Sequence, residues 1–100
     1  MLSFQDHVRA ALDSLPRDLS RKLENVAVVV EDENAEEPDL FGLFDQPEYM
    51  PATITIYRRP LEESFPDPDQ LEEEIRITVL HELAHYFGID EDRLSELGYD

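Results

Sequence analysis

Apolar residues recur with helical spacing over the first 15 positions of the chain. Ser3 can cap this helix, with Asp6 in the capping-box position three residues later. Pro16 ends the pattern and suits the first turn of a second short helix, which carries Leu19 and Leu23. The apolar stripe of the first helix consists of Phe4, Val8, Ala11, Leu12 and Leu15.

Three later segments have the patterns of β-strands. Residues 25–30 are apolar on both faces from Val26 onward, which is typical of a strand inside a sheet rather than at its edge. Residues 40–44 form a short apolar run with an internal glycine. Residues 52–58 alternate, with Ile54 and Ile56 on one face and polar side chains on the other. This alternation suits a strand with one wet face or a strand at a sheet edge.

A long helix follows, with clear signals at both ends. Asp67 is a suitable N-cap, Pro68 fits the first turn, and Gln70 stands at the capping-box position. The helix is predicted to run to Phe87, with Gly88 as its left-handed terminator.

The remaining segments are predicted as two acidic loops and a last helix. Residues 31–39 read as a solvated run of carboxylates, and residues 59–69 as a second, proline-rich acidic loop. A short helix over residues 91–97 would be capped by Asp90 and closed by Gly98. Together these elements predict one α+β domain over residues 1–100, with a small three-stranded sheet.

Charge and composition exclude several classes of function. The chain has 25 Asp and Glu against 8 Lys and Arg, a net charge of −17, so nucleic acid and membrane surfaces are poor partners. It has no cysteine, which excludes disulfides, thiolate zinc sites and a cysteine nucleophile. The start lacks a continuous apolar h-region, and no apolar run approaches the roughly 20 residues that span a bilayer. A cytoplasmic protein is therefore expected.

The sequence His81-Glu82-Leu83-Ala84-His85 carries the candidate chemistry. Two histidines four residues apart lie about 40° apart around a helix, one turn above the other, so they can occupy adjacent corners of a tetrahedral zinc site. Glu82 projects about 100° from His81, which suits a general base better than a third ligand.

On a helical wheel, the two histidines fall in a polar stripe, apart from the apolar face. Apolar side chains cover an arc of roughly 200° of the long helix. The remaining arc of roughly 100° should line a cleft, because so wide an apolar arc implies a mostly buried helix. The stripe consists of Glu74, Thr78, His81, Glu82 and His85.

The residues after the second histidine offer a third ligand. Gly88 allows a sharp turn, after which the residue six positions beyond His85 can return to the metal. That residue is Glu91, and Asp90 and Asp92 flank it, so three carboxylates compete for the position. Two histidines, one carboxylate and a water are an ordinary set of zinc ligands.

The pattern HExxHxxGxx followed by a carboxylate resembles that of the zincin metallopeptidases, and more closely the small bacterial proteins called minimal zincins. The resemblance implies a short mixed sheet flanked by helices. It also implies that His81, His85 and Glu91 bind zinc and that Glu82 is the catalytic base. Beyond the motif, the similarity covers residues 12–16, 25–32, 40–44, 54–61 and 78–98.

The leading hypothesis is therefore a zinc-dependent peptidase acting on peptides or unstructured proteins. The substrate is expected to add as an extended segment to the strand at residues 52–58, taken as the sheet edge. Tyr57, Tyr86 and Tyr99 are the candidates for stabilising the oxyanion. The sequence does not choose among the three, nor does it set the oligomeric state.

Two alternatives stand beside this hypothesis. One is a zinc-binding module without efficient protease activity, either a pseudoenzyme or a protein-interaction domain. The other is an acidic interaction protein without a metal. Outside the motif, His7 is expected at the surface, and Arg58 and Arg59 are expected to pair with neighbouring acids rather than to bind substrate.

Overall fold

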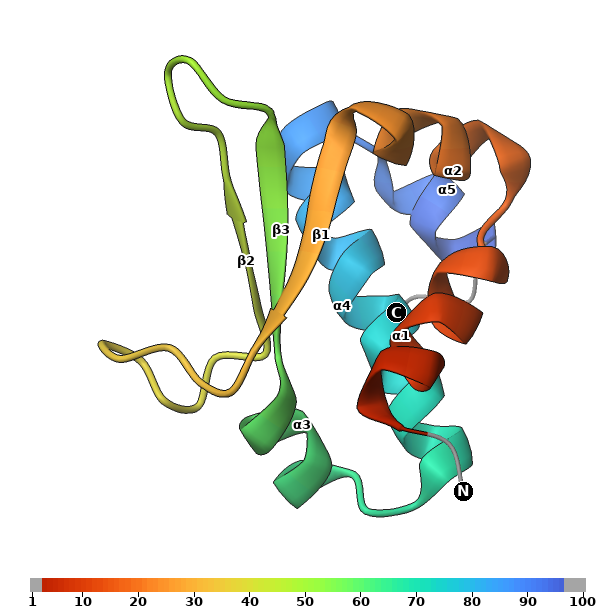
Figure 1. Ribbon diagram of the computed structural model, residues 1–100. Coiled ribbons are helices and arrows are strands. Elements are labelled where there is room, and N and C mark those ends of the chain that lie inside the picture. The colour runs from red at the N-terminus through yellow and green to blue at the C-terminus, as the bar shows by residue number, and fades with distance from the viewer. Residues whose placement is uncertain (1–2, 97–100) are drawn as a thin grey trace.

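A three-stranded sheet lies against a layer of helices in the computed structural model, which describes residues 3–96 apart from the side chain of Glu91 (Figure 1). The strands are β1 (Val26–Glu31), β2 (Gly42–Asp45) and β3 (Ala52–Tyr57), in the order β1-β3-β2. β1 and β3 are parallel, and β2 and β3 are antiparallel. The predicted α+β class with a small mixed sheet is confirmed.

The position predicted for β1 inside the sheet is wrong, while for β3 the alternative of one open face is confirmed and that of an edge strand is wrong. β3 is the central strand and β1 is an edge strand. Ile54 and Ile56 of β3 are fully buried under the helices, while Thr53 and Thr55 face the open side of the sheet. In β1 alternate residues are exposed, Val29 among them at 39%. The alternation of β3 therefore arises because one face of the sheet is open, and not because β3 is an edge strand. The apolar residues of β1 are not buried on both faces.

Most of the helices follow their local signals. Ser3 and Asp6 form the predicted capping box, and Leu23 falls in a 3₁₀ turn rather than in the second helix. The end predicted for the last helix, at Leu97 and Gly98, lies outside the described residues. None of the helices in the described part of the chain has the length and apolarity needed to cross a bilayer. The helices on the inner face of the sheet are α1 (Phe4–Asp13), α2 (Arg17–Lys22), the turn η1 (Leu23–Asn25), α4 (Pro68–Phe87) and α5 (Glu91–Glu96).

One predicted loop contains a helix. α3 (Arg58–Ser64) occupies the first half of the segment expected to be a proline-rich loop. Pro60 is its third residue, a position in the first turn where a missing N–H costs no intrahelical hydrogen bond. Pro60 and Leu61 are buried, so the segment is anchored to the core. The proline therefore marks the beginning of a helix there.

The core forms between the sheet, α1 and α4. Ile75, Val79 and Leu83 of α4 are fully buried in it. His7 of α1 is also buried, at 7% exposure, and its Nδ1 lies 3.0 Å from Oε1 of Glu72 in α4. The expectation of a surface position for His7 is wrong, because α1 packs along α4 on the side that carries this histidine.

Candidate metal centre

The caps of α4 determine where the motif stands. The Asp67 side chain accepts a hydrogen bond of 3.0 Å from the backbone N–H of Gln70 at the start of the helix. Gly88 ends it in the left-handed conformation, at φ 65° and ψ 37°, and donates its N–H to the carbonyl of Ala84. Both predicted ends are confirmed, and they place His81 and His85 in the last two turns.

The two histidines stand side by side on this helix. Their ring centroids are 4.5 Å apart with an interplanar angle of 58°, and both side chains are exposed. Neutral imidazole nitrogens at this spacing suit two adjacent corners of a tetrahedral zinc site. The donor set of this face of α4 therefore fits the metal that the motif implies.

Glu82 lies close to the beginning of β2. Its side chain is half-buried and, with His81, lines a cavity of about 370 Å³ between α4 and the beginning of β2. Thr78 and Glu74 of the predicted polar stripe line the same cavity. The expectation that the stripe borders a cleft is thus confirmed for these four residues.

Gly42 brings β2 close to the motif. A Cβ added at Gly42 would lie 2.6 Å from Cγ2 of Thr78 and 3.9 Å from Cγ of Glu82. Sequence reasoning did not assign Gly42 a role. A glycine inside an otherwise apolar strand is nevertheless a signal of close backbone approach.

The third ligand stays a prediction. Glu91 is the first residue of α5, and its side chain is not among those described. Asp90 accepts a hydrogen bond of 2.9 Å from the backbone N–H of Arg93, as the predicted cap of α5. Among the residues whose side chains are described, no third His, Asp or Glu joins His81 and His85 in a group able to hold a metal ion.

Of the three tyrosine candidates, the structure describes the positions of two, which lie in different places. Tyr57 is buried, and its hydroxyl accepts a hydrogen bond of 3.0 Å from Nδ2 of Asn34, on the face of β3 that points away from α4. Tyr86 follows His85 in α4 and stacks on Phe44 of β2, with centroids 4.2 Å apart. Tyr99 lies outside the described residues. Tyr86 is thus the candidate with a described position near the histidines.

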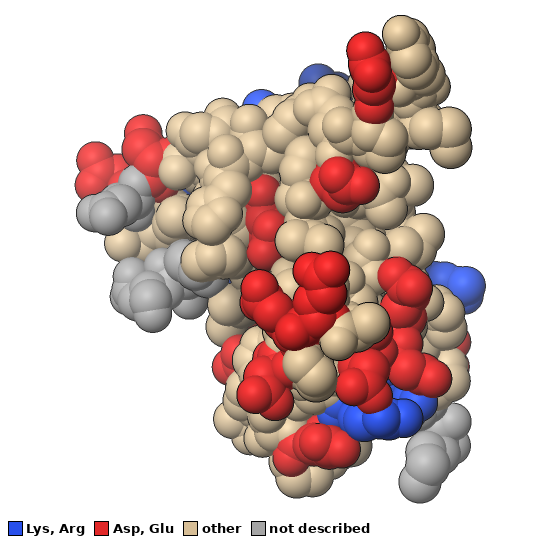
Figure 2. All heavy atoms as spheres, turned by 90° about the vertical axis from the view of Figure 1, so that its left-hand side faces the viewer, with Lys and Arg blue, Asp and Glu red and all other residues tan. Residues whose placement is uncertain are grey.

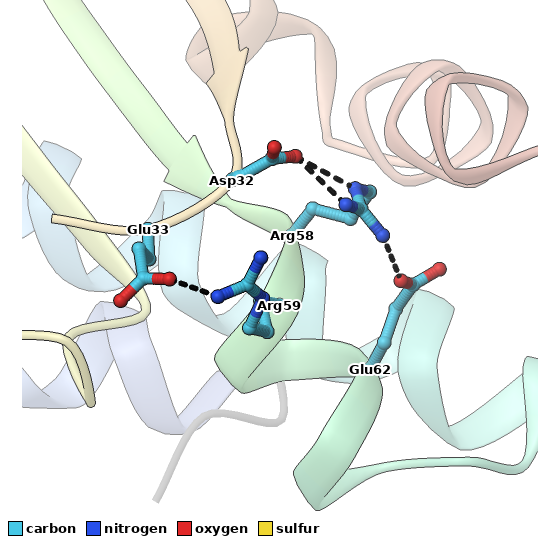
Figure 3. A network of polar contacts seen from close by, with 5 residues as sticks. All are labelled: Asp32, Glu33, Arg58, Arg59 and Glu62. Atoms are coloured by element: carbon cyan, nitrogen blue, oxygen red, sulfur yellow. Dashed lines mark hydrogen bonds and ion pairs between the residues drawn. The ribbon is translucent and has the colours of Figure 1, made fainter.

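Two arginines hold the acidic segment between β1 and β2. Arg58 donates to Asp32 through Nε and Nη2, at 3.1 and 2.8 Å, and to Glu62 at 2.7 Å (Figure 3). Arg59 pairs with Glu33. The hydrogen bonds and charge of Arg58 hold the pKa of Asp32 below its ordinary value, while those of Asp32 and Glu62 raise the pKa of Arg58. The expected pairing of both arginines with acids is confirmed.

This segment is largely exposed, as predicted, and hydrogen bonds also hold its backbone. The Asn34 side-chain oxygen accepts hydrogen bonds from the backbone N–H groups of Glu36 and Glu37, each at 2.9 Å. At its far end, Tyr57 donates its backbone N–H to the carbonyl of Phe41 at 2.9 Å. Only the end of the segment, at residues 39–41, lines the cavity beside the motif.

A family model described as zincin-like metallopeptidase matches residues 23–99. The matched range contains all three strands, the whole of α4 and the cluster of His81, Glu82 and His85. No curated protein matches the chain.

Proposed function

Because the chain belongs to the zincin-like metallopeptidase family, we propose that it hydrolyses peptide bonds with a zinc ion bound by His81, His85 and Glu91. The observation that carries the proposal is the pair of exposed imidazoles on α4, whose ring centroids are 4.5 Å apart. Glu82, the residue after the first histidine, lines the cavity beside them. The family match supports a metallopeptidase, and the arrangement of these side chains supports the roles given to them.

Zinc, when bound, would supply Lewis acidity that lowers the pKa of water and polarises the substrate carbonyl. The Glu82 carboxylate would take a proton from the attacking water while the water oxygen bonds to the carbonyl carbon. It would then deliver that proton to the amide nitrogen as the C–N bond breaks. Its half-buried position beside the sheet limits its contact with bulk water, which suits a base that must hold one orientation.

The expectation that the substrate pairs with residues 52–58 is wrong. Residues 52–58 cannot accept an added strand, because β3 is paired on both sides by β1 and β2. β2 is the edge strand next to α4, and its first residue, Gly42, lines the cavity with His81 and Glu82. An extended peptide paired with the free edge of β2 would pass directly over these residues.

The test compares the protein with a Glu82→Gln variant. The wild type is expected to contain about one zinc per chain by mass spectrometry and to cleave unstructured peptides. Glu82→Gln should retain zinc, because Gln leaves both imidazoles in place, and should lose at least about 100-fold in kcat/KM. Equal turnover by the variant would overturn the role of Glu82.

A zinc-binding module without protease activity is the other outcome of this experiment. Zinc retained by the wild type, without hydrolysis of any peptide in a broad library, would favour that module. Absence of zinc after reconstitution would favour the acidic interaction protein instead. The cytoplasmic location and the preference for peptides or unstructured proteins over nucleic acid and membranes stay predictions.

A further inference from the structure

The cavity beside the motif extends away from the histidines along α4. One wall is the chain at residues 39–42, where the acidic segment enters β2. The other wall is the stretch of α4 from Glu74 to Thr78, and the cavity ends at His81 and Glu82. A substrate side chain entering it would therefore belong to a residue close to the bond that the proposed mechanism cleaves.

Each wall carries an apolar side chain that is packed in place. Phe41 forms one side, and its ring packs edge-on against Phe65, with centroids 5.7 Å apart. Ile77 of α4 faces it across the cavity. The backbone hydrogen bond from Tyr57 to Phe41 holds this wall against β3. The cavity is thus preformed, which lowers the entropic cost of binding a side chain in it.

Besides Glu82, two carboxylates line this cavity, and neither has a partner of its own among the described side chains. Glu74 is half-buried and stands seven residues before His81, about 10 Å along the helix axis on the same face. Asp39 is exposed on the opposite wall. Among the side chains that the structure describes, neither carboxylate has an ion pair or a side-chain hydrogen bond, and no Lys or Arg lines the cavity.

A cavity with apolar side chains on both walls and a carboxylate on one of them has the chemistry of a pocket for a long cationic side chain. The methylene stem of Lys or Arg packs along apolar walls while its charged group reaches an acid. We propose that this cavity binds a Lys or Arg side chain of the substrate, next to the bond to be cleaved, and that Glu74 determines this preference. This inference rests on the function proposed above and adds a substrate class to it.

The overall charge of the molecule acts in the same direction but is a separate effect. Figure 2 shows Asp and Glu side chains gathered over the segment between β1 and β2. With a net charge of −17, the protein attracts any basic peptide, whatever residue enters the cavity. A preference set by the cavity must therefore depend on one position of the peptide and on Glu74, and must survive added salt better than steering does.

The first test measures specificity. A peptide library carries Lys, Arg, norleucine or Glu at one position at a time, on each side of the cleaved bond. The wild type is expected to show a Lys-to-norleucine ratio of kcat/KM of about 10 at one position, since a charge-assisted contact is absent from norleucine. In Glu74→Gln this ratio should fall to about 1, because the amide keeps the shape but removes the charge.

Glu24→Gln is the matched control. Glu24 is exposed in η1, outside the cavity lining, so the variant loses the same unit of charge away from the pocket. Its ratio should equal that of the wild type. A ratio near 1 in the wild type, or equal ratios in Glu74→Gln and wild type, would overturn the pocket while leaving the peptidase intact.

A binding measurement separates the two proposals. In the Glu82→Gln background, the dissociation constants of the Lys and norleucine peptides are compared with and without Glu74→Gln. About tenfold tighter binding of the Lys peptide, lost with Glu74→Gln, supports the pocket even where no hydrolysis is seen. Equal binding of both peptides in the Glu82→Gln protein would overturn it.

Discussion

Gly42 of β2 and Thr78 of α4 are in such close approach that a Cβ at Gly42 would lie 2.6 Å from Cγ2 of Thr78. Thr78 is buried, and its hydroxyl donates a hydrogen bond of 2.8 Å to the carbonyl of Glu74. This fixes the threonine methyl group towards the strand. The contact determines how near the edge strand can come to the His81 and Glu82 side chains.

Gly42→Ala is expected to lower the free energy of unfolding by about 1–3 kcal/mol, because the added methyl group overpacks this contact. The backbone at Gly42 has an ordinary φ, so strain from a left-handed conformation plays no part. Urea unfolding measures the loss. Thr78→Ser removes Cγ2 while keeping the hydroxyl, so it should restore part of the stability in the double variant. A double variant as unstable as the sum of the two single changes would contradict the direct contact.

Zinc is expected to raise the Tm of the wild type and not that of a His81→Ala/His85→Ala variant. A ligand that binds only the folded state adds about 2.7 kcal/mol at 100 times its Kd. The His pair supplies two of the proposed ligands, so its removal should abolish the shift. Glu82→Gln is the control that should keep it. An equal rise in Tm in the double His variant would show that zinc binds elsewhere than at the two histidines of α4.

Acid should remove the stability that Asp32 gains from Arg58. The pKa of Asp32 is lowered from its ordinary value of 3.8 in the folded protein, chiefly by its hydrogen bonds to Arg58. The contribution is therefore present above pH 3.8 and is lost as the pH falls through the lowered folded pKa. Asp32→Asn should be less stable than the wild type at pH 6, with the difference shrinking below about pH 4. Urea unfolding across this pH range measures it.

Salt provides the control for that experiment. Asp32 is exposed and Arg58 is half-buried, so in about 1 M salt, where the screening length is about 3 Å, the difference at pH 6 should also shrink. A difference between wild type and Asp32→Asn that is constant with pH would indicate that the carboxylate charge is not involved.

His7→Ala is expected to lower the free energy of unfolding by about 2 kcal/mol. The substitution leaves a space between α1 and α4 and removes the contact to Glu72, whose Oε1 lies 3.0 Å from the ring Nδ1. Gln5→Ala, at an exposed position of the same helix, should stay within about 0.5 kcal/mol of the wild type. Thermal or urea unfolding compares the two, and equal effects would contradict a packing role for His7.

The helix that carries the motif was predictable because its determinants are local. Asp67, Pro68 and Gly88 act within a turn of their own positions, so their effect can be read without knowing the rest of the fold. The polar stripe of α4 was equally readable, since side chains seven residues apart share a face whatever packs against them.

The arrangement of the strands was not predictable in the same way. Which strand is central depends on pairing between distant segments, and neither β1 nor β3 carries a local signal of its neighbours. His7 shows the same limit, because its burial comes from α4, 65 positions away in the contact to Glu72. The helix at Pro60 was missed for another reason, since proline is compatible with both a loop and a first turn.

The strand order also bears on how the domain assembles. Asp45 of β2 pairs with Thr53, only 8 positions later, whereas Val26 of β1 pairs with Ala52, 26 positions away. Closing the longer loop costs more chain entropy, so we expect the β2–β3 hairpin to form early and β1 to join last. Val28→Ala in β1 should then speed unfolding more than it slows folding. The part of the sheet that borders the proposed active site would thus be built before the sheet is complete.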